Sequence, residues 1–213
     1  IWSKYDYVFW EGLFRTLQLS FVTVLLGTVI GIFIALLKMS KNIIVKIIVN
    51  VYIEIIRGTP ILLQMYFFWL GVPKLVSFDL PDSDWITMSL VVNASAYISE
   101  IIRAGIQAVD KGQGEAARSV GMNRFDTMRV IIMPQAIKNI LPALGNQFIT
   151  MIKGTSLASV FFMGELTTAY KTISAATYLQ IPPLAIAGLI YLMVNYTLSI
   201  IINTYEKSLK AGT

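Results

Sequence analysis

The chain has 213 residues, of which 56% are hydrophobic and 14% are charged, and its formal net charge is +5. A soluble domain carries about 25% charged residues, so this chain has too few to cover a surface that faces water, and the composition indicates an integral membrane protein. It contains neither Cys nor His. That excludes disulfides, metal sites built from thiolates or imidazoles, and nucleophilic chemistry of the Ser–His or Cys–His kind.

Five apolar runs follow one another, and each can supply the roughly 20 residues that a membrane-crossing helix needs. They are Leu13–Leu37, Ile43 to about Val72, Trp85 to about Ile106, Ile137 to about Phe162, and Pro182 to about Tyr205. Pro60 breaks or kinks the second run, and 154–156 interrupts the fourth. We therefore predict an all-α integral membrane fold with five transmembrane helices, in which residues 1–213 form a single transmembrane domain.

A pair of glycines within the first run and a polar stretch between the fourth and fifth runs bear on how the helices pack. Gly27-x-x-x-Gly31 lets a neighbouring helix approach closely, and we interpret it as ordinary helix packing rather than as a dimer contact. Gly164 to Ile181 is polar and rich in small residues, so we expect an outer loop or a partly re-entrant helix there.

The segment 110–134, between the third and fourth runs, is the longest charged stretch of the chain. Asp110 can cap a short helix, with Gln113 as its capping-box partner. Gly121 can end that helix because a residue without Cβ adopts the left-handed C′ conformation easily. Asn123 can then cap a second helix, which we expect Pro134 to close. The pattern predicts two short helices joined by a turn.

The distribution of Lys and Arg fixes the expected orientation. With the N-terminus outside and the C-terminus in the cytoplasm, ten of these residues fall on the inner side and four on the outer side. The inner ones are Lys38, Lys41, Lys46, Lys111, Arg118, Arg124, Arg129, Lys138, Lys207 and Lys210, and the outer ones are Lys4, Arg15, Lys74 and Lys171. The 110–134 segment should therefore be cytoplasmic.

Several charges fall within the apolar runs or, for Glu165, just after one, and a charge inside the membrane costs about 3 kcal/mol or more and marks function by default. They are Glu54, Arg57, Glu100, Arg103, Lys153 and Glu165. Glu54–Arg57 and Glu100–Arg103 share an i,i+3 spacing, so each can also be a self-satisfied pair on one helix face. For Glu100–Arg103 we prefer the structural reading, and for Glu54–Arg57 both readings stay open.

The spacing Glu115-Ala116-Ala117, then Gly121, then Ile131-x-x-Pro134 resembles the EAA loop of permease subunits in binding-protein-dependent ABC importers, with Met133 where Leu is usual. Other stretches resemble the permeases of that family for polar amino acids. These are the stretch from Arg57-Gly58-Thr59-Pro60 to Gln64, Ala96-Tyr97, Glu100, Arg103–Ile106, Gly112-Gln113, Lys153-x-x-Ser156-Leu157 and Glu165-Leu166-Thr167.

The resemblance implies a permease that works with a second permease subunit, either a copy of itself or a related chain. Two cytoplasmic ABC ATPase subunits would bind below, and an extracytoplasmic substrate-binding protein would deliver a polar amino acid from above, in a prokaryotic inner membrane. The chain has no Gly-rich loop followed by Gly-Lys-Ser/Thr, so ATP and Mg would be bound by the partner ATPase. We expect no enzyme activity, cofactor, metal or nucleic acid in this chain, and lipid around its spans.

The candidate contact with the ATPase comprises Glu115, Ala116, Ala117, Arg118, Gly121, Phe125, Met128 and Pro134. Ala116 and Ala117 would give the first short helix a small apolar face, Phe125 and Met128 would be apolar anchors, and the arginines would pair with acidic groups. An interfacial helix pair without a partner is the alternative.

The candidate substrate-binding residues are Glu54, Arg57, Thr59, Gln64, Glu100 and Glu165. Arg57 could meet a carboxylate and a glutamate an ammonium group, and the excess of carboxylates suits a cationic amino acid, moved by alternating access. A permease for another small solute, an ion-coupled secondary transporter and a membrane scaffold are the alternatives.

Overall fold

The computed structural model describes residues 2–211, and the side chains of residues 3–209, so the side chain of Lys210 lies outside this part. Every regular element within residues 2–211 is helical. The elements are α1 (Trp2–Lys38), α2 (Ile43–Gly58), α3 (Ile61–Tyr66), η1 (Phe67–Gly71), α4 (Val72–Leu75), α5 (Asp82–Gln107), α6 (Lys111–Ser119), α7 (Arg124–Asp126), η2 (Thr127–Ile132), α8 (Met133–Gly154), η3 (Thr155–Phe161), α9 (Leu166–Thr177) and α10 (Ile181–Ala211).

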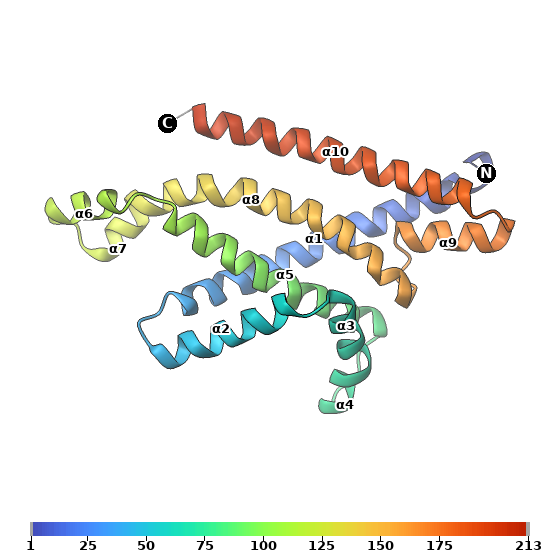
Figure 1. Cartoon of the computed structure of the whole chain (residues 1–213), viewed down its shortest axis with the longest axis horizontal. Helices are drawn as coiled ribbons and strands as arrows, with labels where there is room; N and C mark the ends of the chain where they lie inside the picture. Colours follow the sequence, from blue (N-terminus) through green and yellow to red (C-terminus); the bar gives the residue numbers. More distant parts are fainter. Residues whose placement is uncertain (1, 212–213) are drawn as a thin grey trace.

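The longest helices, α1, α5, α8 and α10, run along the long axis of the molecule (Figure 1). The short helices α6 and α7 project at one end of this axis, on the same side as the C-terminal end of α10 (Figure 1). The beginning of α1 lies at the opposite end, beside α9. The arrangement therefore separates the 110–134 segment from the beginning of the chain by the full length of the molecule.

Three helices among the described residues are long and apolar enough to cross a membrane, namely Ser3–Lys38, Asp82–Gln107 and Ile181–Leu209. They correspond to the expected first, third and fifth spans, and the first begins earlier than Leu13. The expected second span is not one helix, because the chain leaves the helix at Thr59 and restarts after Pro60. The expected fourth span is α8 followed by the 3₁₀ turn η3.

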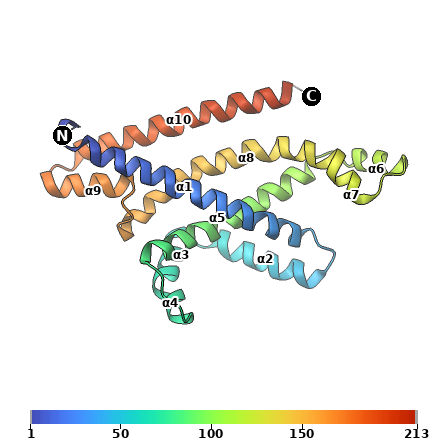
Figure 2. The same ribbon diagram turned by 180° about the vertical axis from the view of Figure 1, so that it is seen from behind.

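The small residues of α1 pack against α5, which crosses it at close range (Figure 2). A Cβ atom added at Gly27 would stand 2.9 Å from Ala94 Cβ, and one at Gly31 would stand 3.0 Å from Ile98 Cγ2. Real Cβ atoms essentially never come closer than 3.0 Å to another heavy atom, so neither position leaves room for a side chain unless its neighbour moves. The interpretation of Gly27 and Gly31 as packing residues within the chain is confirmed.

The stretch from Gly164 to Ile181 is a packed helix rather than a loop. Leu166 and Ile173 of α9 are buried in one apolar cluster with Phe9 of α1 and Ile190 of α10. Apolar side chains at helical spacing let α9 cover the beginning of α1, so of the two alternatives expected from the sequence the structure favours a helix over a loop.

Pro134 does not close the second short helix, contrary to the prediction. The helix that begins at Arg124 passes through η2, a π-helical stretch, and continues as α8 to Gly154. Proline lacks a backbone N–H and its ring crowds the preceding turn, and a π turn relieves both effects by widening the helix just before the ring. One continuous helix therefore joins the 110–134 segment to the interior of the bundle.

Candidate functional site

The first half of the 110–134 segment folds as the caps predict. The Asp110 carboxylate accepts a hydrogen bond from the Gly112 backbone N–H (2.7 Å) and so caps α6. Gln113 contributes its backbone N–H, which donates to the Asp110 carbonyl (3.1 Å). The N-cap is confirmed, while Gln113 takes part through its main chain rather than through its side chain.

The turn after α6 is a Schellman motif centred on Gly121. Gly121 has φ +90°, a conformation that glycine adopts at little cost. Its N–H donates to the Arg118 carbonyl, and the Met122 N–H donates to the Ala117 carbonyl, both at 3.1 Å. These are the two bonds that define the motif. The Asn123 side chain then accepts from the Asp126 N–H (2.9 Å), so both predicted boundaries are confirmed.

The outer face of this helix–turn–helix carries apolar side chains that no described residue of the chain covers. Val120 is 80% exposed and Phe125 is 70% exposed. Glu115, Ala116, Arg118 and Pro134 are exposed as well, while Met128 is half-buried. Ala117 is 6% exposed and lies on the inner face of α6, so of the two alanines only Ala116 is accessible.

A hollow of about 600 Å³ lies beside α6, between it and the ends of α5 and η2. Its walls combine apolar side chains with charges of both signs. The lining residues are Ile106, Gln107, Val109, Asp110, Lys111, Gly114, Glu115, Arg118 and Ile132. We take this hollow and the exposed apolar residues together as the candidate docking surface.

Glu54 and Arg57 are exposed near the end of α2. Among the described residues, Glu54 and Arg57 do not form an ion pair with each other. The Arg57 guanidinium lies over the ring of Tyr97 on α5, with 5.2 Å to the ring centroid. This is the geometry of a cation–π contact. The self-paired reading therefore does not hold for Glu54 and Arg57, and both charges can reach a ligand or a partner chain.

Thr59 and Gln64 are joined to each other across the break at Pro60. Gln64 Nε2 donates to the Ile56 carbonyl (2.7 Å) and to Thr59 Oγ1 (2.8 Å). Its Oε1 accepts from Asn93 Nδ2 of α5 (3.0 Å). Gln64 thus satisfies a carbonyl group that the proline leaves without its helical partner, and its place in the substrate site stays a prediction.

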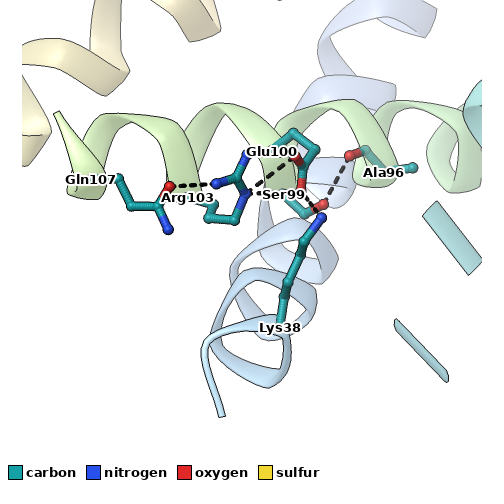
Figure 3. Close-up of polar contacts among 6 residues, drawn as sticks. All are labelled: Lys38, Ala96, Ser99, Glu100, Arg103 and Gln107. Atoms are coloured by element: carbon teal, nitrogen blue, oxygen red, sulfur yellow. Dashed lines mark hydrogen bonds and ion pairs between the residues drawn. The ribbon is translucent and has the colours of Figure 1, made fainter. Parts of the chain in front are cut away.

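Glu100 is part of an ion-pair cluster on the face of α5 (Figure 3). Its carboxylate lies 2.8 Å from Arg103 Nη2 and 2.7 Å from Lys38 Nζ, which comes from the end of α1. Arg103 also donates to Gln107. The structural reading of Glu100 and Arg103 is favoured by these contacts. Lys38 was missed, because nothing in the local sequence connects it with a residue 62 positions further on.

Glu165 is completely buried and caps α9. It accepts hydrogen bonds from the Thr167 N–H (2.6 Å), the Thr168 N–H (2.8 Å), the Thr168 hydroxyl (2.7 Å) and the Tyr191 hydroxyl (3.3 Å). Both of its oxygens are used within the chain, and the negative charge suits a helix N-terminus. The structure gives Glu165 a capping role, and its assignment to substrate binding stays a prediction.

Residues 27–211 match the family described as binding-protein-dependent transport system inner membrane component. The chain is 39% identical to the arginine transport system permease protein ArtQ of Bacillus subtilis (strain 168), over 95% of this chain and 92% of that protein. It is 38% identical to a putative glutamine transport system permease protein GlnP of Rickettsia bellii (strain RML369-C), over 93% and 91%. With the nopaline transport system permease protein NocM of Agrobacterium fabrum (strain C58 / ATCC 33970) it shares 41% identity, over 86% and 80%.

Among solved structures, one described as an amino acid ABC transporter with histidines superposes with a TM-score of 0.92 at 44% identity, covering 97% of this chain and 96% of that one. Inward-facing MetNI methionine ABC transporter structures superpose with a TM-score of 0.71 at 18% identity in one crystal form, covering 94% and 97%. The second similarity concerns the fold alone.

Proposed function

Because the chain belongs to the family of binding-protein-dependent transport system inner membrane components, we propose that it is the membrane-spanning permease of an importer for polar, in particular cationic, amino acids. The resemblance seen in the EAA-type spacing is thereby confirmed, and the chain is a transport subunit rather than an enzyme. Its family works with an ATPase and a substrate-binding protein. In our proposal, ATP hydrolysis in the partner drives alternating access across a prokaryotic inner membrane.

The exposed surface of the 110–134 segment is the observation that carries the ATPase contact. Val120, Phe125 and Val130 of this segment are among the exposed large apolar side chains of the chain. Exposed arginines flank them, at Arg118 and Arg124. An apolar centre with a charged rim is the usual anatomy of a protein interface. Each of two ATPase subunits, holding ATP and Mg, would receive one such surface, supplied by one permease subunit.

Phe125→Ala tests this contact, with Phe14→Ala as a matched control, because Phe14 is similarly exposed at 66% but belongs to α1. We expect Phe125→Ala to weaken co-purification of the ATPase about tenfold or more, as truncating an interface anchor does. Phe14→Ala should leave co-purification unchanged. Equal recovery of the ATPase with both variants would show that the surface is not the docking site.

The membrane topology we propose keeps five spans. The second consists of α2 and α3, which Gln64 ties together across the break, and the fourth consists of α8 and η3. In this arrangement the N-terminus is outside and the C-terminus is cytoplasmic, and residues 1–213 act as one permease domain. The opposite positions of α9 and the 110–134 segment along the long axis support it (Figure 1).

Glu54 and Arg57 remain as the core of the proposed substrate contact. Their side chains are exposed on an apolar helix, where uncovered charge is costly, so we expect a second permease subunit to cover them. Arg57 would then meet the carboxylate of the amino acid and Glu54 its ammonium group. Relatives named for arginine, glutamine and nopaline transport support a polar amino-acid cargo.

The cargo is tested by reconstituting the permease with its ATPase and binding protein in proteoliposomes and measuring ATP turnover and uptake over a panel of amino acids. We expect arginine, lysine or histidine to stimulate both, and Glu54→Gln to reduce uptake of these more than of glutamine. Stimulation by neutral amino acids alone would overturn the cationic assignment. Uptake without ATP, driven by an ion gradient, would favour a secondary transporter.

A further inference from the structure

Glu100 is the central residue of a cluster that joins two helices. One of its oxygens lies 2.7 Å from Lys38 Nζ on α1, and the other lies 2.8 Å from Arg103 Nη2 on α5. The three side chains are between 17% and 28% exposed, so water screens these pairs less than it screens pairs on an open surface. Figure 3 shows Lys38 reaching up to α5 from the end of α1.

The row of contacts continues toward the 110–134 segment. Arg103 donates to the side chain of Gln107, which is the last residue of α5. Gln107 lines the hollow beside α6 together with Glu115 and Arg118. A series of polar side chains therefore runs from the last residue of α1 to the wall of the proposed ATPase docking surface.

Neutralising Glu100 does not require Lys38. Arg103 lies one turn further on the same helix, where an i,i+3 partner is always within reach, and it already offers the carboxylate three hydrogen bonds. Close packing of α1 on α5 does not require Lys38 either, since Gly27 and Gly31 provide it. What Lys38 adds is a connection between the end of α1 and the base of the 110–134 segment.

We propose that Lys38 is a positioning residue for transport, which holds the end of α1 to α5 through Glu100 so that a movement of α6 displaces both helices together. The proposal rests on the proposed function, in which the ATPase moves α6. Without this connection α6 still docks and ATP is still hydrolysed, but part of each movement is lost before it reaches α1. The expected defect is therefore one of coupling and not of assembly.

Lys38→Met tests the proposal because it leaves the Glu100–Arg103 pair in place and so preserves the fold. In proteoliposomes with the ATPase and binding protein, we expect substrate transported per ATP hydrolysed to fall about threefold, within the range of energies that link contacting groups. Lys38→Arg should keep the wild-type ratio. Lys41→Met is the matched control, since Lys41 is exposed nearby and has no ion pair among the described residues.

A double-mutant cycle separates the connection from a general effect of charge. In a Glu100→Gln background, Lys38→Met should cause no further fall in substrate transported per ATP hydrolysed. The proposal would be overturned if Lys38→Met alone kept the wild-type value, or if Lys38→Met lowered the value equally with Glu100 and with Gln at position 100.

A second readout does not depend on the cargo. The chain has no cysteine, so Ser40→Cys and Ser119→Cys place spin labels at the end of α1 and on α6 alone. With the ATPase bound, we expect the distance between the labels to stay constant between the nucleotide-free and ATP states, and to change with ATP in Lys38→Met. If the distance between the labels responds to ATP in the same way with Lys38 present and in Lys38→Met, the connection is refuted. Failure of every amino acid to be transported refutes only the proposed cargo.

Discussion

Replacing Glu165 by alanine should destabilise the protein without touching substrate choice. The substitution removes the N-cap of α9, which costs about 1 kcal/mol. It also leaves the Thr168 hydroxyl and the Tyr191 hydroxyl without the Glu165 acceptor, at roughly 1–3 kcal/mol each. We expect a total loss of about 4 kcal/mol in the free energy of unfolding, with the cap and the stranded donors both contributing.

For a chain of this length, each kcal/mol shifts the melting temperature by about 2–4 °C. Glu165→Ala should therefore melt roughly 10 °C below the wild type in a thermal-shift assay of the detergent-purified permease. Glu165→Gln keeps one accepting oxygen and should lie between the two. Glu54→Gln, at an exposed position, provides the control and should melt with the wild type.

If Glu165→Ala melts with the wild type while the set of transported amino acids changes, Glu165 binds substrate and its capping contacts are incidental. If Glu165→Ala is less stable and the surviving protein keeps its selectivity, the capping role stands.

Three further substitutions test other parts of the fold. Gly27→Val would force a side chain onto Ala94, and we expect a loss of about 1–3 kcal/mol in thermal stability, whereas Gly58→Ala, with nothing within 4 Å of its Cβ, should be tolerated. In Gly121→Ala the alanine must hold φ +90°, which costs roughly 1–2 kcal/mol. We therefore expect this substitution to weaken co-purification of the ATPase, and full binding would contradict the role of this turn. Gln64→Leu strands the Ile56 carbonyl and should lower the melting temperature by about 3–6 °C, from a loss of roughly 1–2 kcal/mol.

The parts of the 110–134 segment that the sequence predicts correctly depend only on neighbours. The caps at Asp110 and Asn123 and the turn at Gly121 are closed by bonds that span at most five residues, so local residue types suffice to specify them. Pro134 misleads because the rule that proline ends a helix assumes α-helical hydrogen bonding. In the π-helical stretch η2 this hydrogen-bonding pattern does not hold, so the helix continues past Pro134. The sequence carries no comparably clear signal for a π-helical stretch.

The charged residues within the apolar runs are harder to assign from sequence. A charge in a span indicates function by its cost, but Glu165 and Glu100 are stabilised by partners that lie far away in the chain, at Tyr191 and Lys38. Such contacts depend on how the helices pack. Glutamate is also not a preferred N-cap residue, so the capping role of Glu165 could be recognised only after α9 was seen to start there.

The unbroken helix from Arg124 through Pro134 to Gly154 makes a lever arm of this part of the chain. At the rise of an α-helix it is about 45 Å long, so a tilt of about 5° at the Phe125 end would displace the other end by roughly 4 Å. The arm runs on into η3, where Phe161 packs edge-on against Tyr66 and Trp69, with ring centroids 5.0 and 5.5 Å away. Neither Pro134 nor Pro142 interrupts this helix. In our proposal, a small rotation at the ATPase contact would therefore be passed along the helix and become a larger displacement at its other end.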